Sequence, residues 1–600
     1  MSSASPSLSL PLADEAPHEA TGFWRKYVFS TDHKVIGLQY GLTALCFLLF
    51  GFLLMLVMRW QIAHPGQPVP VVGPVLAWLL GGPAAKGMVS PDLYNSFGAM
   101  HGTIMVFLAI VPLAFAAFGN YLVPLQIGAP DMAFPRVNMA SYQFYVVGGL
   151  VMFVSFFIPG GAAQAGWTSY PPLAEAIPTD GQTFWLVGMI CLITSSLLGA
   201  VNFIATVIQL RAPGMTWMRL PFFVWAQFVT AFLLLLAFPP LEAAGVMQLM
   251  DKVAHTSFFL PTGLAVGGRL AGVSGGGSPL LWQHLFWFLA HPEVYVLILP
   301  AMGIVSEIIA NNTRKPIWGY RSLVFSALTI GFLSFIVWAH HMYLTGMGTT
   351  ISAFFQTTTM LISIPSVIIL TCLFISLWGG SIRFTTPMLF AMAFLPMFGI
   401  GGLTGLPLGL SVSDIHLHDT YYVIAHFHYI VAPGTIFAIF AGIYHWFPKI
   451  TGRRLSDFWG KVHFWTSLIF MNLVFQPMFA QGMAGMLRRM ADGGANYSQA
   501  RAPEALGGLS PFVMHLHTYI LWAALGLGLA QVPFIINFFW SIRHGQPVGS
   551  DNPWQATTLE WQTPTPPPHG NFATPPAVHR GPYEYSVPGQ AADFTPQNQA

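Results

Sequence analysis

Charge is the property that this sequence has least of. Only 7% of its 600 residues are charged and 54% are hydrophobic, whereas soluble domains usually carry ~25% charged residues. The mean hydropathy is +0.61. The net charge of +2 gives no indication of a nucleic-acid partner, and none is expected. These values exclude an ordinary water-soluble domain and predict a polytopic membrane protein.

Cysteine is also scarce. Cys46, Cys191 and Cys372 each lie in an apolar segment, where a buried thiol behaves as a small hydrophobic side chain. No pair has the spacing of a zinc or disulfide framework, and the Cys-x-x-Cys-His heme-attachment motif does not occur. Residues 1–22 contain no apolar run, so a cleavable signal peptide is not expected.

Long apolar segments dominate the rest of the chain. A membrane-spanning helix needs ~20 apolar residues, and twelve segments qualify: roughly 36–58, 96–122, 141–160, 183–208, 221–245, 281–310, 319–344, 351–378, 387–409, 420–446, 461–483 and 513–542. Twelve spans place both termini on one side. Most Lys and Arg residues lie in loops on that side, which the positive-inside rule makes cytoplasmic.

The predicted fold is therefore an all-α membrane protein with twelve transmembrane helices and both termini in the cytoplasm. Residues 1–30 form a cytoplasmic N-terminal segment and residues 31–548 form the helical domain. Residues 549–600 contain a Pro-rich run and are expected to form an extended cytoplasmic tail rather than a folded domain.

One stretch, His291-Pro292-Glu293-Val294-Tyr295, lies in the middle of the segment 281–310. Residues four apart share one face of a helix, so His291 and Tyr295 point the same way and Glu293 points roughly to the other side. Ionisable side chains at this depth are costly and mark functional sites. Other apolar segments carry further histidines, all predicted in the outer half of the membrane: His101, His340, His341, His426 and His428.

The spacing of these histidines indicates two kinds of metal site. His426 and His428 are ~200° apart around a helix, so they can serve two hemes on opposite faces, since each heme takes an axial imidazole. His101 can supply the second axial ligand to one heme, which leaves the other heme open. The remaining three histidines form a set that suits copper: His291, His340 and His341.

A heme iron with an open position facing such a copper ion is a site for binding and reducing a diatomic molecule. The alternative for each histidine is a hydrogen bond between helices, which is the commoner role for a single intramembrane histidine. Six histidines at matching depth, together with the His-x-x-x-Tyr spacing, favour the metal interpretation.

These residues lie in long and specific motifs. The motifs are Gly119-Asn120, 127–136 (Ile-Gly-Ala-Pro-Asp-Met-Ala-Phe-Pro-Arg), Gly166-Trp167-Thr168, 283–287 (Gln-His-Leu-Phe-Trp), 338–342 (Trp-Ala-His-His-Met) and 418–422 (His-Asp-Thr-Tyr-Tyr). With them the chain resembles subunit I of the heme–copper terminal oxidases, of the cytochrome c oxidase type. The resemblance runs from about Ser30 to Pro564, nearly the whole chain.

The resemblance implies a role for each metal-binding residue. The low-spin heme would be ligated by His101 and His428, the high-spin heme by His426, and copper B by His291, His340 and His341. Tyr295 would be covalently bonded to His291 and would supply an electron and a proton. Residues matching the heme-binding positions are Arg59, Trp167, Arg488 and Arg489, and those matching a magnesium or manganese site are His418 and Asp419. The two hemes are expected to be of the heme a type.

The resemblance also implies a proton path from the cytoplasm. Asp131 would be its mouth, Asn120 and Asn138 would lie along its water chain, and Glu293 would be the branching carboxyl at its end. Without the motif, the simpler interpretation of Asp131 would be a loop carboxylate near Arg136.

One position departs from the family pattern. Related oxidases usually have a second proton path with a lysine in a Pro-Thr-Gly-Ile-Lys run, and here Ile369 stands at the lysine position. The hypothesis is that a hydroxyl–water chain replaces it and leads from Glu307 through Ser306 and Ser366 towards Tyr295. The alternative is that these hydroxyls bond to their own helix backbone, that Glu307 is a solvated charge, and that all protons use the Asp131 path.

The resemblance implies a catalytic subunit that reduces O2 to water and pumps protons. Electrons would come from cytochrome c or a similar periplasmic donor through a second subunit that carries a dinuclear copper site, and a third subunit is expected. The implied location is a respiratory membrane, of the bacterial inner-membrane type.

Three other functions are compatible with parts of this pattern. A quinol oxidase would have Gln five residues before the first heme histidine, where this chain has Ser96. A nitric oxide reductase would lack Tyr295. A cofactor-free transporter would explain twelve helices with buried ionisable residues, but not the spacing of the histidines.

Overall fold

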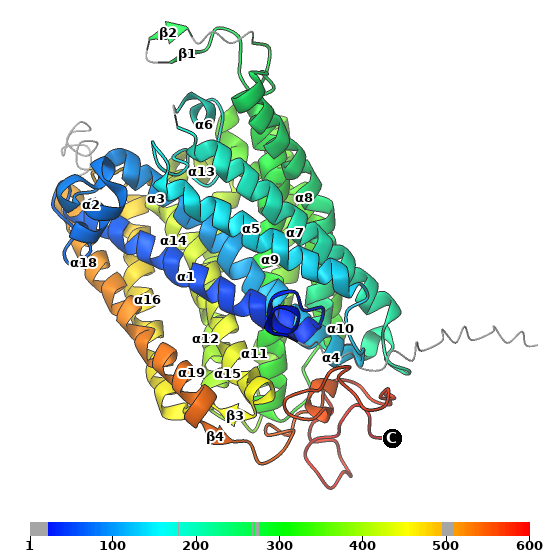
Figure 1. Ribbon diagram of the computed structural model, residues 1–600. Helices are drawn as coiled ribbons and strands as arrows, with labels where there is room; N and C mark the ends of the chain where they lie inside the picture. Colours follow the sequence, from blue (N-terminus) through cyan, green and yellow to red (C-terminus); the bar gives the residue numbers. More distant parts are fainter. Residues whose placement is uncertain (1–21, 178, 267, 271–274, 495–508) are drawn as a thin grey trace, which may run out of the picture.

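Long helices run side by side through the whole molecule (Figure 1). This computed structural model describes residues 22–177, 179–266, 268–270, 275–494 and 509–600, except for the side chains of 509–511. Within these ranges the only sheets are two antiparallel pairs of two-residue strands. They are β1 (Ala265–Val266) with β2 (Arg269–Leu270), and β3 (Arg453–Arg454) with β4 (Gln546–Pro547). The protein is therefore mostly helical, as predicted.

The first half of the chain contributes seven long or medium helices and several short ones. They are η1 (Trp24–Val28), α1 (His33–Ala63), α2 (Gly73–Leu80), η2 (Gly82–Gly87), α3 (Pro91–Thr103), η3 (Ile104–Ile110), η4 (Pro112–Ala117), α4 (Phe118–Ile127), α5 (Pro135–Val154), η5 (Ser155–Phe157), α6 (Leu173–Ala176), α7 (Gly181–Gln209), η6 (Trp217–Arg219), α8 (Phe222–Ala254) and α9 (Pro279–Thr313).

The second half continues the bundle and ends in a tail with little regular structure. Its helices are α10 (Tyr320–Leu333), η7 (Ser334–Ile336), η8 (Trp338–Thr345), α11 (Gly348–Leu377), α12 (Thr386–Gly409), α13 (Ser411–Leu417), α14 (Tyr421–Ile430), η9 (Val431–Ile436), α15 (Phe437–Thr451), α16 (Asp457–Met483), α18 (Leu509–Ala530), α19 (Val532–His544) and η11 (Leu559–Gln562).

Eleven helical stretches of the described chain are long and apolar enough to cross a membrane. Each coincides with one of the twelve predicted spans. The remaining predicted span, 461–483, lies in α16, which is 27 residues long but contains more polar side chains. The count of twelve and the cytoplasmic location of the termini stay predictions.

Two of the spans are irregular where an ordinary α-helix was expected. The second span winds through two π-helical stretches, η3 and η4, and Pro112 begins the second of them, where its missing N–H removes a helix bond. The seventh span ends in a 3₁₀ stretch, η8, which carries His340 and His341. π and 3₁₀ stretches within longer helices often mark functional sites.

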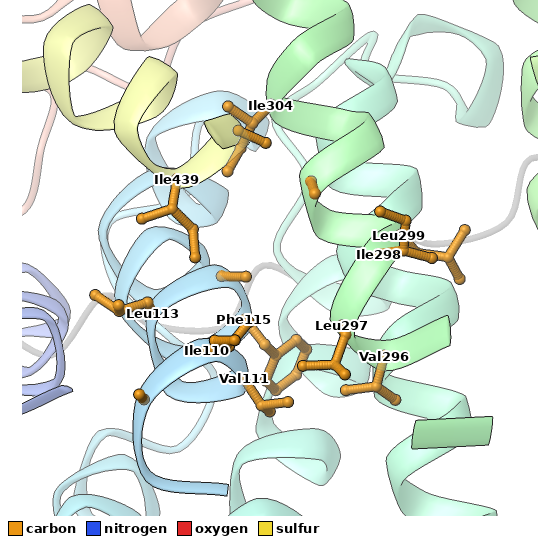
Figure 2. Packing of buried hydrophobic residues seen from close by; sticks show 14 of the residues in the cluster. Ile110, Val111, Leu113, Phe115, Val296, Leu297, Ile298, Leu299, Ile304 and Ile439 are labelled. Carbon is orange, nitrogen blue, oxygen red and sulfur yellow. The ribbon is translucent and has the colours of Figure 1, made fainter. Parts of the chain in front are cut away.

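Helix α9 lies at the centre of the packing. It packs closely against α8 and α15, and Leu297 and Val296 of α9 meet Val111 and Phe115 of the second span in an apolar layer (Figure 2). The close approach of α8 requires a glycine. A Cβ at Gly303 would lie 2.8 Å from the Phe223 Cα and 3.1 Å from the Ala226 Cβ.

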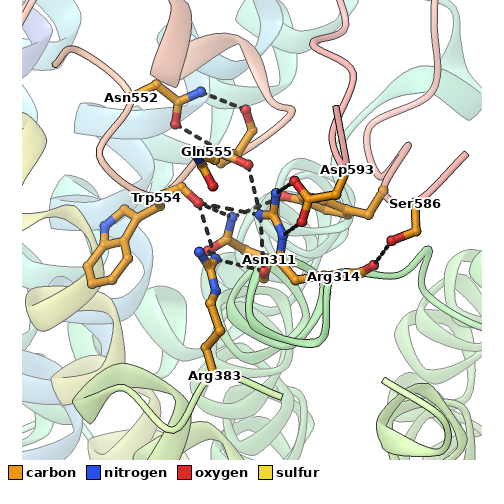
Figure 3. Close-up of polar contacts among 10 residues, drawn as sticks. Asn311, Arg314, Arg383, Asn552, Trp554, Gln555, Ser586 and Asp593 are labelled. Atoms are coloured by element: carbon orange, nitrogen blue, oxygen red, sulfur yellow. Dashed lines mark hydrogen bonds and ion pairs between the residues drawn. The ribbon is translucent and has the colours of Figure 1, made fainter. Parts of the chain in front are cut away.

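The tail after residue 549 has little regular structure beyond η11, but it is not a free chain. Arg314, at the end of α9, donates from Nε and Nη2 to the two carboxylate oxygens of Asp593 at 2.8 and 2.6 Å (Figure 3). Its Nη1 donates to the Gln555 carbonyl at 2.9 Å, and Arg383 donates to the Trp554 carbonyl at 3.1 Å. Composition did not predict this, because these contacts join segments that are distant in sequence.

The tail also reaches the beginning of α1. The Asn571 side chain accepts from Lys34 Nζ at 2.9 Å and donates to the Ala129 carbonyl at 2.8 Å, and it bonds to His33 Nε2 as well. The start and the end of the described chain therefore lie at the same end of the bundle. An even number of spans requires this arrangement.

The contact at Gly303 gives a testable prediction. Gly303→Ala forces α8 and α9 apart, and overpacking of this kind costs about 1–3 kcal/mol, so we expect less assembled, heme-loaded protein in purified membranes. Gly402→Ala is the matched control, because a Cβ at Gly402 meets nothing within 4 Å. Equal heme content in the two variants, measured by absorption per milligram, would contradict the packing argument.

Candidate metal centre and proton path

Three imidazoles come together where the sequence predicted copper. One ligand atom from each of His291, His340 and His341 lies within 4.8 Å of the other two. The ring centroids are 4.2 Å apart for His340 and His341 and 4.6 Å apart for His291 and His340. Three nitrogen donors converging on one point suit a copper or zinc ion. The sequence-predicted copper ligands are thus neighbours in space.

Surrounding groups fix the orientation of these rings. His340 Nδ1 lies 2.9 Å from Thr359 Oγ1, and the His341 ring stacks on Trp287 at 3.8 Å with an interplanar angle of 11°. His291 Nδ1 lies 3.4 Å from His341 Nε2. Fixed ring orientation of this kind is what metal-binding histidines need from their neighbours.

Tyr295 follows His291 by one helical turn, as the spacing predicted. Their ring centroids are 4.9 Å apart, and His291 Nε2 is buried without a hydrogen-bond partner among the described residues. A buried ring nitrogen without a partner is rare. It suits the covalent bond to Tyr295 that the resemblance implies.

The three predicted heme ligands share one arrangement. In each, Nδ1 is paired with a backbone carbonyl: His101 with Gly51 at 2.8 Å, His426 with Gly401 at 2.9 Å and His428 with Ile424 at 2.8 Å. A carbonyl can only accept, so Nδ1 carries the proton and Nε2 keeps a lone pair with which it could bind iron.

The structure also groups these histidines as expected. His426 is close enough to His340 and His341 to interact with both electrostatically, and His428 interacts with His101 in the same way. The copper set and the high-spin heme ligand therefore lie together, and the two low-spin heme ligands lie together. These pairings support the division into two heme sites.

Arg59 and Trp167 line the region around the heme ligands. Arg59 is buried, its Nη1 has no partner among the described residues, and its guanidinium lies 5.6 Å from the Tyr421 ring. The Trp167 ring packs edge-on against Phe286 and Trp287. A buried guanidinium nitrogen without a hydrogen-bond partner could donate to a polar substituent of a bound group.

The predicted outer cation site is only partly assembled. His418 Nδ1 lies 3.3 Å from an Asp414 oxygen, and His418 Nε2 lies 3.9 Å from an Asp419 oxygen. Asp419 also pairs with Arg488 at 2.6 Å. Burial alone would raise the pKa of Asp419, but Arg488 lowers it below its usual value. Magnesium needs about six oxygen ligands, so water or another chain would have to supply the rest.

Arg489 lies beside the Gly166-Trp167-Thr168 motif. A Cβ at Gly166 would be 3.1 Å from the Arg489 guanidinium carbon, so the glycine makes room for this arginine. The Arg488 N–H donates to the Asp419 carbonyl at 2.9 Å, and this bond holds the Arg488-Arg489 segment beside Asp419. The two arginines and the predicted cation site are therefore neighbours.

Asp131 lies between α4 and α5, at the same end of the bundle as the tail. Its carboxylate accepts from the Met132 amide at 2.6 Å. Burial raises the pKa of Asp131 to about 7, although the Met132 amide acts in the opposite direction. A group with this pKa can both bind and release protons at neutral pH.

A small cavity lies between the second span, α1, α5 and α7; apolar residues make up most of its lining, and we call it the polar cavity for the polar side chains in its wall. It encloses about 30 Å³, room for about two water molecules, and its wall includes Asn120, Tyr40, Ser141, Ser195 and Ser196. Tyr40 Oη lies 3.1 Å from both Ser141 Oγ and Ser195 Oγ. The predicted residue Asn120 thus lines the same cavity as the linked hydroxyls of Tyr40, Ser141 and Ser195.

Asn138 is the second predicted residue on this route. Its amide nitrogen and oxygen are both buried without partners among the described residues, as is the Asn120 amide oxygen. Ser141 Oγ donates to the Asn138 carbonyl at 2.7 Å, so Asn138 adjoins the cavity. Buried amide atoms of this kind are normally satisfied by ordered water.

Glu293 is almost completely buried, and neither of its carboxyl oxygens has a partner among the described residues. It is not among the residues that line the polar cavity. Val111 and Phe115, which do line it, pack against α9 in the apolar layer of Figure 2. Val111 and Phe115 of the cavity wall therefore pack against apolar residues of α9, Val296 and Leu297, which follow Glu293 by about one helical turn.

The hydroxyls of the hypothetical second path bond to their own helices. Ser306 Oγ donates to the Met302 carbonyl at 2.7 Å, and Ser366 Oγ donates to the Ile362 carbonyl at 3.3 Å. Ile369 is buried. These bonds favour the alternative interpretation, although each hydroxyl oxygen can still accept from water.

Sequence reasoning missed several residues of these sites. Tyr40, Ser141, Ser195 and Ser196 come from three different helices and have no common spacing, so only the fold brings them together. Asp414 could have been noticed, because it precedes His418 by one helical turn. Among these missed residues, only Asp414 has a spacing to a predicted site residue that the sequence itself shows.

Comparisons with known proteins point to one family. A family model described as cytochrome c and quinol oxidase polypeptide I matches residues 35–541. The chain is 46% identical over 584 residues to the alternative cytochrome c oxidase subunit 1 of Bradyrhizobium diazoefficiens, covering 96% of this chain and 93% of that protein. It is 42% identical over 571 residues to cytochrome c oxidase subunit 1 of Synechocystis sp., covering 95% and 94%. Its fold is similar to the cryo-EM structure of a heme–copper terminal oxidase dimer, with a TM-score of 0.68, 19% identity and coverage of 86% and 84%.

The three-imidazole cluster gives a testable prediction. His291→Ala, His340→Ala and His341→Ala should each remove one copper ion per chain, because two imidazoles hold the ion far less tightly than three, and should leave the low-spin heme spectrum intact. His284→Ala is the control, since His284 lies on the same helix but bonds to Trp338. Metal analysis that found unchanged copper in all three variants would refute the ligand assignment.

Proposed function

The chain belongs to the heme–copper oxidases as a catalytic subunit I, and from that premise we propose that it reduces O2 to water and pumps protons across a respiratory membrane. The observation that carries the proposal is that one ligand atom from each of His291, His340 and His341 lies within 4.8 Å of the other two. Tyr295 follows His291 by one helical turn. A cofactor-free transporter would not need this cluster, whereas a quinol oxidase would share it.

The side chains fit the two hemes and copper B that the family implies. We assign the ligands as before: His101 and His428 to the low-spin heme, His426 to the high-spin heme, and the three-imidazole cluster to copper. When bound, the open heme iron and copper supply the coordination and the electrons with which O2 is reduced. Arg59, Trp167, Arg488 and Arg489 are assigned to holding the hemes.

Two side chains of α9, Tyr295 and Glu293, then deliver protons. Tyr295 holds a phenolic proton one turn from His291, so it can deliver that proton where oxygen bonds are broken. Glu293 has two unpartnered oxygens in an apolar setting, which suits a group that passes a proton on through transient water. The resemblance suggests that it is the branching point between water formation and pumping.

Protons enter at Asp131 and move along the polar cavity. The partner-free amide atoms of Asn120 and Asn138 and the hydroxyls of Tyr40 and Ser195 provide alternating sites for water. The apolar layer beyond the cavity would separate it from Glu293 until water enters. We propose that this barrier helps protons to pass in one direction.

Cytochrome c or a similar periplasmic protein is proposed as the electron donor. The Cys residues of this chain do not form a dinuclear copper site, so a second subunit would carry that site, and a third subunit is expected.

The quinol alternative is weaker because Ser96 is buried and its hydroxyl donates to the Ala162 carbonyl at 3.0 Å. Ser96 borders a cavity of about 330 Å³, so quinol should be included in assays. We further propose heme a in both heme sites, magnesium or manganese at His418 and Asp419, and the bacterial inner membrane as the location.

Asp131 provides the test of function. Proteoliposomes with the purified complex should consume O2 and release protons when given reduced cytochrome c. Asp131→Asn should lower turnover by about tenfold or more and abolish proton release, because an amide cannot collect protons. Asp551→Asn, at an exposed carboxylate near the same end of the bundle, should leave both unchanged. Normal proton release by Asp131→Asn would exclude this entrance.

The second path remains a separate proposal, running from Glu307 through Ser306 and Ser366 towards Tyr295. Glu307→Gln and Ser366→Ala should slow reduction of the high-spin heme more than oxidation of the reduced enzyme, since the second path serves the reductive step in related oxidases. Thr357→Ala is the control, because Thr357 is exposed on the same helix as Ser366. Stopped-flow reduction at the wild-type rate in both variants would leave Asp131 as the only entrance.

A further inference from the structure

Glu307 is not the solvated charge that its position near a helix end would allow. It lies seven residues before Arg314 on α9 and is only 5% exposed. Its Oε1 accepts two hydrogen bonds, from Tyr583 Oη at 2.5 Å and from the Phe223 amide at 3.2 Å. Both donors are neutral groups, and no cation pairs with Glu307 within the described parts of the chain. Glu307 is therefore a buried acid held by hydrogen bonds alone.

The tail supplies the closer of these two donors. Tyr583 is buried, and its hydroxyl accepts from the Phe222 amide at 2.7 Å while it donates to Glu307. Burial raises the pKa of Tyr583 well above its usual value, and the nearby Glu307 raises it further. The phenol thus keeps its proton and remains a donor. Tyr583 bridges the start of α8 and the end of α9.

The residues on either side of Tyr583 are fixed to the same helix end. Tyr585 Oη accepts from the Asn311 amide at 3.2 Å, and Ser586 Oγ donates to the Arg314 carbonyl at 2.7 Å. The Arg314–Asp593 pair of Figure 3 holds the chain beyond them. A charge-assisted pair with two parallel hydrogen bonds is among the stronger polar contacts. The tail is therefore fastened over Glu307 rather than resting loosely on it.

Two other ionisable groups face this region. Glu560, from the tail, interacts electrostatically with Glu307, and the Tyr320 ring lies 6.0 Å from the Tyr583 ring. Tyr320 Oη donates to the Leu220 carbonyl and not to a carboxylate. Glu560 is itself buried and accepts from Gln126 at 3.1 Å. Neither group replaces Tyr583 as the partner of Glu307.

We propose that the C-terminal tail is a cover that controls the exchange of protons between Glu307 and the cytoplasm, with Tyr583 as the positioning residue and Arg314–Asp593 as the fastening pair. The ligand of this site is the proton itself, delivered by water when the tail opens locally. The role of Glu307 in supplying the metal centre rests on the proposed second path, whereas the cover does not.

Chemical labelling of carboxyl groups tests the cover. The purified complex is treated with a water-soluble carbodiimide and an amine, and the fraction of Glu307 converted to amide is followed by mass spectrometry. Asp593→Asn should label Glu307 about tenfold faster than wild type, which corresponds to a tail opening made easier by about 1.4 kcal/mol. Glu584→Gln is the matched control, because it breaks an ion pair with Arg580 inside the tail and should leave the rate unchanged. Equal labelling of Glu307 in wild type and Asp593→Asn would overturn the proposal.

Infrared difference spectroscopy tests the positioning role. The carboxyl band that disappears in Glu307→Gln identifies the group. Tyr583→Phe should shift that band because it removes one of the two hydrogen bonds to Glu307. Tyr320→Phe is the control and should leave the band unshifted, because the Tyr320 hydroxyl bonds to the Leu220 carbonyl. An unshifted band in Tyr583→Phe would show that Tyr583 does not position Glu307.

The two proposals fail separately. If Glu307→Gln reduces the high-spin heme at the wild-type rate but labelling and infrared results are as expected, the cover is correct and the second path is wrong. If Glu307→Gln slows reduction but labelling is equal in all variants, the path stands and the cover is wrong.

Discussion

Buried nitrogen and oxygen atoms need partners, and this requirement governs how the molecule is built. Leaving such an atom without a partner costs about 1–3 kcal/mol, and more for a charged group. The three histidines proposed as heme ligands satisfy Nδ1 by pairing it with the carbonyls of Gly51, Gly401 and Ile424. Some of the buried atoms that lack a partner among the described residues lie at the candidate sites: His291 Nε2, both Glu293 oxygens, the Asn120 amide oxygen and both polar atoms of the Asn138 amide. Here the missing partners are those that a metal centre and a water chain would provide.

Helix α9 joins these requirements along a single element. Its first half carries His291 and Tyr295, its middle carries the apolar face of Figure 2, and its C-terminal part carries Glu307, with Arg314 directly after its last residue. At 1.5 Å per residue, Tyr295 and Glu307 are about 18 Å apart along the axis. A displacement of this helix would therefore affect the metal centre and the tail together. Gly303 makes the close packing with α8 possible, which limits such displacements.

The parts of the site that the sequence predicts are those that repeat at local spacing. His291 and Tyr295 are one turn apart in any α-helix, and the division of His426 and His428 between two faces follows from the same geometry. The polar cavity could not be predicted in this way, because Tyr40, Ser141 and Ser195 meet only after α1, α5 and α7 have packed. The 3₁₀ stretch at His340 was also missed, since an apolar pattern of that length is equally compatible with an α-helix.

The tail shows where composition misleads. A Pro-rich segment was expected to be extended, but chain with little regular structure can be folded and buried when its polar groups find partners elsewhere. The carbonyls of Trp554 and Gln555 accept from Arg383 and Arg314, and proline removes backbone donors that would otherwise need partners. Trp561, Tyr583 and Tyr585 then add buried aromatic area. The apolar and arginine-rich ends of the helices determine this packing, so the tail can be understood only together with the bundle that it covers.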